Sequence, residues 1–281
     1  MPSFDTPEPI GATVQLRSGL VRIIASDRTD TVVDVRPSDE FDDGDGKAAE
    51  QTQVEYSQGR LLVKGPKHRS RWLTGWGPSI VMTIELPSGS SIDVSAAAAD
   101  VRCEGRLGET KIDNAYGEIW LERAARLRLR TGYGGITVAR SDGDADIATS
   151  GGEVRIGEID GSAVIKNAHG DITVDGVTGH LRLSTASGDI TVGRTLADVA
   201  AKTAYGGVRI GRVVRGVVVA ETSYGRLEVG VAAGTAAWLD VSSQYGRVDA
   251  SLEASDGPAE SDETAEVRAR TAYGDVVIHR A

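Results

Sequence analysis

Cysteine is almost absent from this chain of 281 residues, which contains only Cys103. One thiol cannot form an internal disulfide, and it cannot build a metal site that needs several thiolates. A reducing compartment, the cytoplasm, is consistent with this composition. The histidines show no metal-ligand spacing, so we expect neither a metal nor a cofactor. The histidines are His68, His169, His180 and His279.

Long apolar runs are missing as well. No stretch approaches the roughly 18 apolar residues of a membrane span, and the opening MPSFDTPEPI lacks the basic start and apolar stretch of an export signal. The net charge is −10, from 31 basic and 41 acidic residues. Attraction to nucleic acid or anionic lipid is therefore not expected over most of the surface. Together these features predict a soluble cytoplasmic protein that binds no nucleic acid.

Aromatic residues make up only 5% of the chain, whereas glycine is abundant, with 35 residues. This combination favours many short strands joined by tight turns. A chain of this length can also bury a sizeable core without disulfide bonds. The composition therefore predicts an all-β protein.

An internal repeat dominates the sequence, and it is marked by one recurring glycine that we call the anchor. Ala99 takes its place in the first copy, and the spacing between successive copies is 18, 17, 18, 18, 18, 18, 19, 21 and 28 residues. A fixed period of this kind is the signature of a stacked repeat architecture. The anchor glycines are Gly117, Gly134, Gly152, Gly170, Gly188, Gly206, Gly225, Gly246 and Gly274.

Apolar residues alternate on both sides of each anchor. Two and four positions after it every copy is apolar, as in Ile172 and Val174, and seven and five positions before it the pattern recurs, as in Leu181 and Leu183. Alternate residues share one face of a strand, so each repeat predicts two short strands with one buried face. A two-strand unit cannot close its own core, and copies must stack. We predict a parallel β-solenoid of two-strand coils of about 18 residues, right-handed by default.

Two columns of like residues accompany the anchors, which we expect to have positive φ at a corner. Three positions before the anchor a polar residue recurs, and we predict a hydrogen-bonded ladder there. Directly before the anchor tyrosine recurs. We interpret this column as a structural ladder, with a stacking surface for sugars or bases as the alternative. The polar column is Asn114, Thr131, Thr149, Asn167, Thr185, Thr203, Thr222, Ser243 and Thr271, and the tyrosine column is Tyr116, Tyr133, Tyr205, Tyr224, Tyr245 and Tyr273.

The first 95 residues are less regular. We interpret 1–95 as irregular coils and loops continuous with the solenoid of 96–281, which carries an acidic insertion at 251–265. The segment SGLVRIIASDRTDTVVDVRPSD predicts strand, turn, strand; YSQGRLLVKG resembles the later SYGRLEVG; and DEFDDGDGKAAEQ predicts a polar loop. A separate N-terminal domain is the alternative.

One cluster departs from the acidic balance of the chain. Basic residues interleaved with indoles suit phosphate, lipid headgroups or an acidic partner, and a solvated loop is the alternative interpretation. Trp120 is a further candidate, because it occupies an outward position where neighbouring copies carry threonine or arginine. The cluster consists of Lys64, Lys67, His68, Arg69, Arg71, Trp72 and Trp76.

Catalytic motifs are not found in the sequence. Asp171 and Asp189 fall in register on adjacent copies, as carboxylates do in carbohydrate-cleaving β-helices, but their equivalents in neighbouring copies include Gly207 and Arg226. No phosphate-binding loop, nucleophile elbow or dinucleotide fingerprint is present. We therefore expect no enzymatic activity and no catalytic residues, and an enzyme acting on carbohydrate is the least favoured alternative.

Several segments outside the repeats resemble a known family. They are FDTPEPI, RIIASDRTDTVVDVRPSD, QGRLLVKGPK, AAWLDV and EVRARTAYGDVVIHR. With the repeats they make the chain similar to the bacterial β-strand-repeat proteins called "putative adhesins", or toastrack domains. The resemblance covers nearly the whole chain. It implies a β-solenoid and, in some relatives, a place beside envelope-stress sensors, but no established reaction or catalytic residues.

Two functional hypotheses follow from these patterns. The first is a scaffold or interaction protein that associates with itself, because the final coil TAYGDVVIHRA leaves no sequence for a terminal cap. The partner is then a second copy meeting the C-terminal coil, unless the insertion at 251–265 covers that end. The second hypothesis is a sensor or binding module that recognises an envelope-stress ligand or an acidic partner through 64–76. Contact with a membrane is expected only through this loop.

Overall fold

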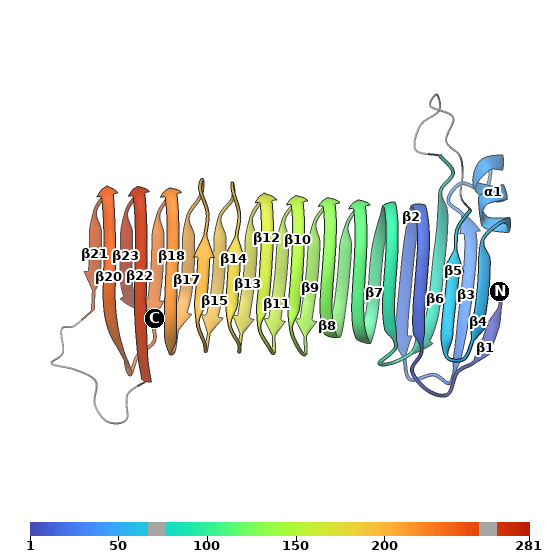
Figure 1. The fold of residues 1–281 in the computed structure, drawn as a ribbon, viewed down its shortest axis with the longest axis horizontal. Helices are drawn as coiled ribbons and strands as arrows, with labels where there is room; N and C mark the ends of the chain where they lie inside the picture. Colours follow the sequence, from blue (N-terminus) through green and yellow to red (C-terminus); the bar gives the residue numbers. More distant parts are fainter. Residues whose placement is uncertain (67–76, 253–262) are drawn as a thin grey trace. The chain divides into compact units, whose positions relative to one another are not determined.

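The structure is a computed structural model that describes residues 1–66, 77–252 and 263–281. It consists of two compact units, Met1–Asp142 and Gly143–Ala281. Both units are built almost entirely of β-strands (Figure 1). Within each unit, most strands pair in parallel with the equivalent strand of the neighbouring coil. The prediction of an all-β parallel solenoid of two-strand coils is therefore confirmed.

The first unit combines parallel coils with an antiparallel N-terminal part. Its coils are formed by β2, β7, β8 and β9, and its antiparallel pairs by β1, β3, β4, β5 and β6. The elements are β1 (Ser3–Asp5), β2 (Gly11–Ser26), β3 (Asp30–Pro37), α1 (Asp43–Glu50), β4 (Gln53–Ser57), β5 (Arg60–Lys64), β6 (Ile80–Pro87), β7 (Ser91–Tyr116), β8 (Ile119–Tyr133) and β9 (Ile136–Ser141).

Strand β2 is a complete coil that the sequence alignment did not include. It pairs in register with β7, so that Gly19 lies opposite Ala99 and Val21 opposite Val101. Gly19 has a φ of 137°, and positive φ recurs at every later anchor glycine except Gly225 and Gly246. Val14, Val21 and Ile23 are fully buried at the expected core positions. The repeat therefore begins one coil earlier than the sequence pattern indicated.

On the side of β2 away from β7, the pairing of strands changes from parallel to antiparallel. β5 and β6 pair in parallel with the two halves of β2. β4 then pairs antiparallel with β5, β3 with β6, and β1 with β3. The match of YSQGRLLVKG to SYGRLEVG is wrong in one respect. Leu61 lies opposite Ala12, before the anchor, whereas Leu227 follows its anchor.

The segment predicted as a polar loop contains helix α1, so that prediction is wrong. Asp42 caps the helix by accepting hydrogen bonds from the backbone nitrogens of Gly44 and Asp45, at 2.7 and 3.0 Å. The carboxylate of Asp45 accepts hydrogen bonds from the backbone of Asp39 and Ser79. Gly44 and Gly46 lower the helix propensity of the sequence, which is why the pattern predicted a loop.

The second unit is a regular stack of coils, each with one strand before the anchor and one after it. Pairing between equivalent strands is parallel throughout. The strands are β10 (Ala145–Gly151), β11 (Val154–Ile159), β12 (Ala163–His169), β13 (Ile172–Val177), β14 (Leu181–Ser184), β15 (Ile190–Thr195), β16 (Val199–Lys202), β17 (Val208–Val213), β18 (Gly216–Tyr224), β19 (Leu227–Val231), β20 (Thr235–Tyr245), β21 (Val248–Ser251), β22 (Glu263–Tyr273) and β23 (Val276–Arg280).

The core of this unit consists of the predicted apolar columns. Ile172 pairs with Ile190, and Val174 pairs with Val192. All four side chains are fully buried. Their parallel register on adjacent coils confirms the prediction made from the repeat.

The hydrogen bonds of the polar column go to backbone carbonyl oxygens, mostly those of the neighbouring coil, and do not form the predicted side-chain ladder in the described chain. The hydroxyl of Thr203 donates to the carbonyl oxygen of Gly188 at 3.1 Å, and Thr222 donates to that of Gly206 at 2.8 Å. A Cβ atom added to Gly206 would lie 2.2 Å from the same Gly188 oxygen. The anchor is therefore glycine both for its positive φ of 140° and because the neighbouring carbonyl fills the space of a side chain.

The last coils do not stack in the order of the chain. β22 pairs with β18 on one side and with β20 on the other, and β23 pairs with β19 and β21 in the same way (Figure 1). The C-terminal coil therefore lies between the coils of 216–231 and 235–251. The spacing of 21 residues between Gly225 and Gly246 supplies the extra length needed to step over it.

Candidate interaction surface

The coil formed by β20 and β21 has a neighbour on one side only among the described strands, and we call it the end coil (residues 235–251). The row of backbone N–H and C=O groups on its other side is left without a strand partner in this part of the chain. Such an edge is a template for pairing with another chain. Natural edges are often protected by proline or lysine, and neither residue occurs in TAAWLDVSSQYGRVDAS.

The apolar core is open at the end coil. Val248 is 45% exposed, whereas Val276, its register partner one coil inward, is fully buried. Leu239 is half-buried, although its partner Val267 is fully buried. Trp238 is 60% exposed. Leu239 and Val248 are thus core positions left open here, and Trp238, which lies opposite Glu266 on the outer face, extends the exposed apolar strip.

The C-terminal strand was predicted to be the uncovered end, and that placement is wrong. β22 and β23 each have a strand on both sides. The guanidinium of Arg280 donates hydrogen bonds to the carbonyl oxygens of Ala232 and Thr235, at 3.0 and 2.8 Å. Most of the insertion that was considered as an intramolecular cover, residues 253–262, lies outside the described residues.

Four tyrosines form a continuous stack that ends at the end coil. The ring centroids of Tyr205 and Tyr224 lie 5.2 Å apart, those of Tyr224 and Tyr273 4.8 Å, and those of Tyr273 and Tyr245 4.7 Å. The interplanar angles are 14° or less. This spacing leaves no room for a sugar or base between rings, so the inner rings present only their edges to solvent. In the first unit, Tyr116 and Tyr133 stack at 5.6 Å.

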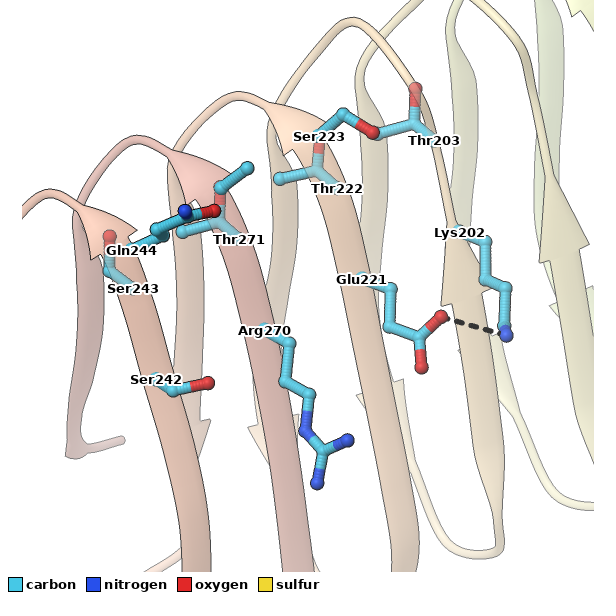
Figure 2. A pocket seen from close by; sticks show the side chains of 11 residues that line it. Lys202, Thr203, Glu221, Thr222, Ser223, Ser242, Ser243, Gln244, Arg270 and Thr271 are labelled. Carbon is cyan, nitrogen blue, oxygen red and sulfur yellow. Dashed lines mark ion pairs between the residues drawn. The ribbon is translucent and has the colours of Figure 1, made fainter.

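A shallow groove runs beside this tyrosine stack across four coils (Figure 2). It is lined by small or polar side chains such as Ser223 and Ala272, and by the ion pair of Lys202 and Glu221, 2.8 Å apart. Arg270 also lines the groove and pairs with Asp240 at 2.7 Å. The charged groups that line the groove are therefore neutralised within the molecule.

The aligned carboxylates have backbone partners. Asp171 accepts a hydrogen bond from the backbone nitrogen of Asp189 at 2.8 Å, and Asp189 accepts one from that of Gly207 at 2.7 Å. Each carboxylate thus joins the turn of its own coil to the turn of the next. Their regular alignment is a consequence of these turns.

Only one member of the predicted basic and aromatic cluster lies within the described residues. Lys64 is half-buried at the end of β5. The six further members of the cluster, from Lys67 to Trp76, lie outside the described residues. Trp120 occupies its predicted outward position but is half-buried, and the Arg102 guanidinium lies 4.7 Å from its ring centroid. A cation–π contact within the chain thus covers part of this indole.

The titratable groups described in the structure form no cluster of three or more side chains that suits a metal ion. Cys103 is fully buried, and burial raises the pKa of its thiol to about 12. Arg22 and Arg102 hold the pKa of Glu104 below its usual value through hydrogen bonds on the outer face. No helix of the described chain is long and apolar enough to span a bilayer.

Comparison with known proteins identifies a family and a few distant structures. The model of a family described as toastrack DUF4097 matches residues 12–279. A solved structure described as a "putative adhesin" from Bacteroides fragilis is 13% identical, with a TM-score of 0.44, over 100% of this chain and 95% of that one. A "putative cell adhesion protein" from Clostridium sporogenes is 11% identical, with a TM-score of 0.25, over 100% and 98%. No curated protein matches.

Proposed function

The chain belongs to the toastrack DUF4097 family, and on that premise we propose that it is a non-enzymatic interaction scaffold that associates with further copies of itself. The observation that supports this proposal is the end coil. It combines unpaired strand edges, an open core and the exposed side chains of Trp238 and Val248. Large apolar patches of this kind are typical of protein interaction sites.

The carboxylates favour the same proposal over an enzyme. Asp171 and Asp189, the two that align as a catalytic pair would, are engaged with backbone nitrogens of the turns. The groove beside the tyrosine stack contains paired charges and small hydroxyl side chains. Both features suit a surface that binds and does not react.

The size of the full chain in solution tests the proposal. Light scattering during gel filtration, at micromolar concentration, is expected to give a mass above that of one chain. Val248→Asp places a charge in the exposed strip and is expected to return the protein to a monomer. Val164→Asp is the matched control, since Val164 is also exposed but lies on the outer face of β12. A monomeric wild-type protein over the whole concentration range would overturn the proposal.

Two further predictions concern the location of the protein and its basic loop. A cytoplasmic location is part of the proposed function, and fractionation of cells that produce the tagged full chain tests it. Binding of an envelope-stress ligand or an acidic partner through 64–76 stays a second prediction. Replacing Lys67, Arg69 and Arg71 by alanine is expected to abolish binding to anionic vesicles, if the wild-type protein shows it, without a change in melting temperature.

A further inference from the structure

Arg247, directly before β21, and Asp249, within it, are self-complementary charges on the end coil. Arg247 and Asp249 flank Val248, and both side chains are exposed. Neither is in an ion pair with another residue of the described chain, although Asp249 accepts a hydrogen bond from Ser251 at 3.2 Å. In an antiparallel pair of strands, residues directly opposite each other lie on the same face. A strand with arginine and aspartate two positions apart can therefore pair both charges with a second copy of itself.

The equivalent residues of an internal coil satisfy their charges within the chain. The carboxylate of Glu228 lies 3.7 Å from the guanidinium of Arg226, directly before the same strand, and 3.5 Å from that of Arg209 in the preceding coil. Asp240, the acidic residue of β20, is paired with Arg270 at 2.7 Å. The charges of the end coil without an ion pair in the described chain are thus Arg247 and Asp249, on either side of the exposed Val248.

We propose that the end coils of two copies pair antiparallel about a two-fold axis at Val248, so that Arg247 of each copy faces Asp249 of the other. This inference rests on the proposed function and specifies how the two copies contact each other. The axis brings Val248 against its own copy and makes two identical ion pairs. A two-fold axis perpendicular to both sheets also sets β20 against β20 and β21 against β21. The contact is the same on both copies, so the assembly closes as a dimer.

Charge reversal tests this register. Arg247→Asp places two aspartates opposite each other, and Asp249→Arg places two arginines opposite each other. Each single variant is expected to weaken the dimer by about tenfold or more, because like charges replace both ion pairs. The double variant Arg247→Asp with Asp249→Arg restores both pairs and is expected to dimerise like the wild type. Arg182→Asp, an exposed reversal in β14, is the control and leaves the dimer unchanged.

Mixing the two single variants gives the decisive result. Arg247→Asp carries two negative charges beside Val248 and Asp249→Arg carries two positive charges there, so the mixture is expected to form the heterodimer in preference to either homodimer. Native mass spectrometry distinguishes the species when one variant carries a tag. A wild-type dimer that both single variants retain would overturn this register but leave self-association standing. A mass that increases with concentration beyond two chains would instead indicate a head-to-tail filament.

Discussion

The coil of β22–β23 and the end coil beside it differ far more in environment than in sequence pattern. Both carry apolar residues at the four core positions, a tyrosine and an anchor glycine. Val276 and Ile278 are fully buried in the first, whereas Val248 and Ala250 are exposed in the second. In a solenoid, burial of a coil is thus decided by whether neighbours lie on both sides. The pattern of a coil indicates its two strands but not its place in the stack.

Thiol labelling gives the largest contrast between an internal coil and the end coil. In a Val248→Cys variant, the new thiol is expected to react at least about a thousandfold faster than Cys103, whose pKa of about 12 leaves very little thiolate at neutral pH. Both thiols are followed in one dilute sample, so Cys103 is the built-in reference. Rapid native labelling of Cys103 would contradict its place in the core.

The same variant reports association. If copies meet at Val248, labelling of the cysteine at that position is expected to slow as protein concentration rises, whereas labelling of Cys103 stays constant.

The raised pKa of Cys103 also sets the direction in which folding stability changes with pH. Folding favours the neutral thiol, so this contribution to stability is complete below the ordinary thiol pKa and is lost as pH rises toward 12.

A buried charge gives the next largest contrast. Ile190→Asp is expected to destabilise the fold by about 4 kcal/mol or more, because it buries an unpaired carboxylate between two coils. Val248→Asp leaves its carboxylate in water and is expected to cost less than about 1 kcal/mol in the monomer. Urea unfolding of both variants at low concentration measures the difference. Similar losses would show that the end coil is as enclosed as the interior.

Two glycines, the anchor Gly188 and Gly234 in a turn, allow the cost of a positive φ to be measured separately from the cost of a steric clash. Gly188 has a φ of 142°, and a Cβ atom there would lie 2.2 Å from the carbonyl oxygen of Gly170. Gly234 has a φ of 78° but no atom within 4 Å of an added Cβ. Gly188→Ala is expected to cost about 3 kcal/mol or more, and Gly234→Ala only about 1 to 2 kcal/mol. Equal losses would mean that φ alone requires the glycine.

Much of the fold follows from the repeat, since its signal is periodic and local. The two strands of each coil, the core residues and the parallel register all come from one alignment on the anchor. The strand of β2 was predicted, but its place as a coil in register with the repeats was missed, because a polar loop and antiparallel strands separate the sequence around Gly19 from the regular copies. Helix α1 was missed because its cap and the two hydrogen bonds to the Asp45 carboxylate outweigh the glycines that its sequence contains.

The location of the candidate site could not be predicted from the repeat, because it depends on the order in which the coils stack. Chain order predicted that the last residues form the open end, but β22 inserts between β18 and β20. A signal was present in the sequence, since the spacings of 21 and 28 residues exceed one coil and allow the chain to step over a position and return. Read only as insertions, they did not indicate which coil is exposed.

The smallest contrast concerns the hydrogen bonds of the polar column. Thr203 is buried and donates to Gly188 at 3.1 Å, whereas Ser243 in the end coil is half-buried and donates to Gly274 at 2.8 Å. Thr203→Val keeps the shape but leaves a buried carbonyl oxygen without this donor, so a loss of about 1 kcal/mol is expected. At Ser243→Ala water can reach the carbonyl, and the loss is expected to be a few tenths of a kcal/mol. Urea midpoints of the two variants, measured below the concentration of association, compare the two sites. If the copies pair as proposed, the cost of Ser243→Ala should approach that of Thr203→Val at high concentration, because the second copy then excludes water from the end coil.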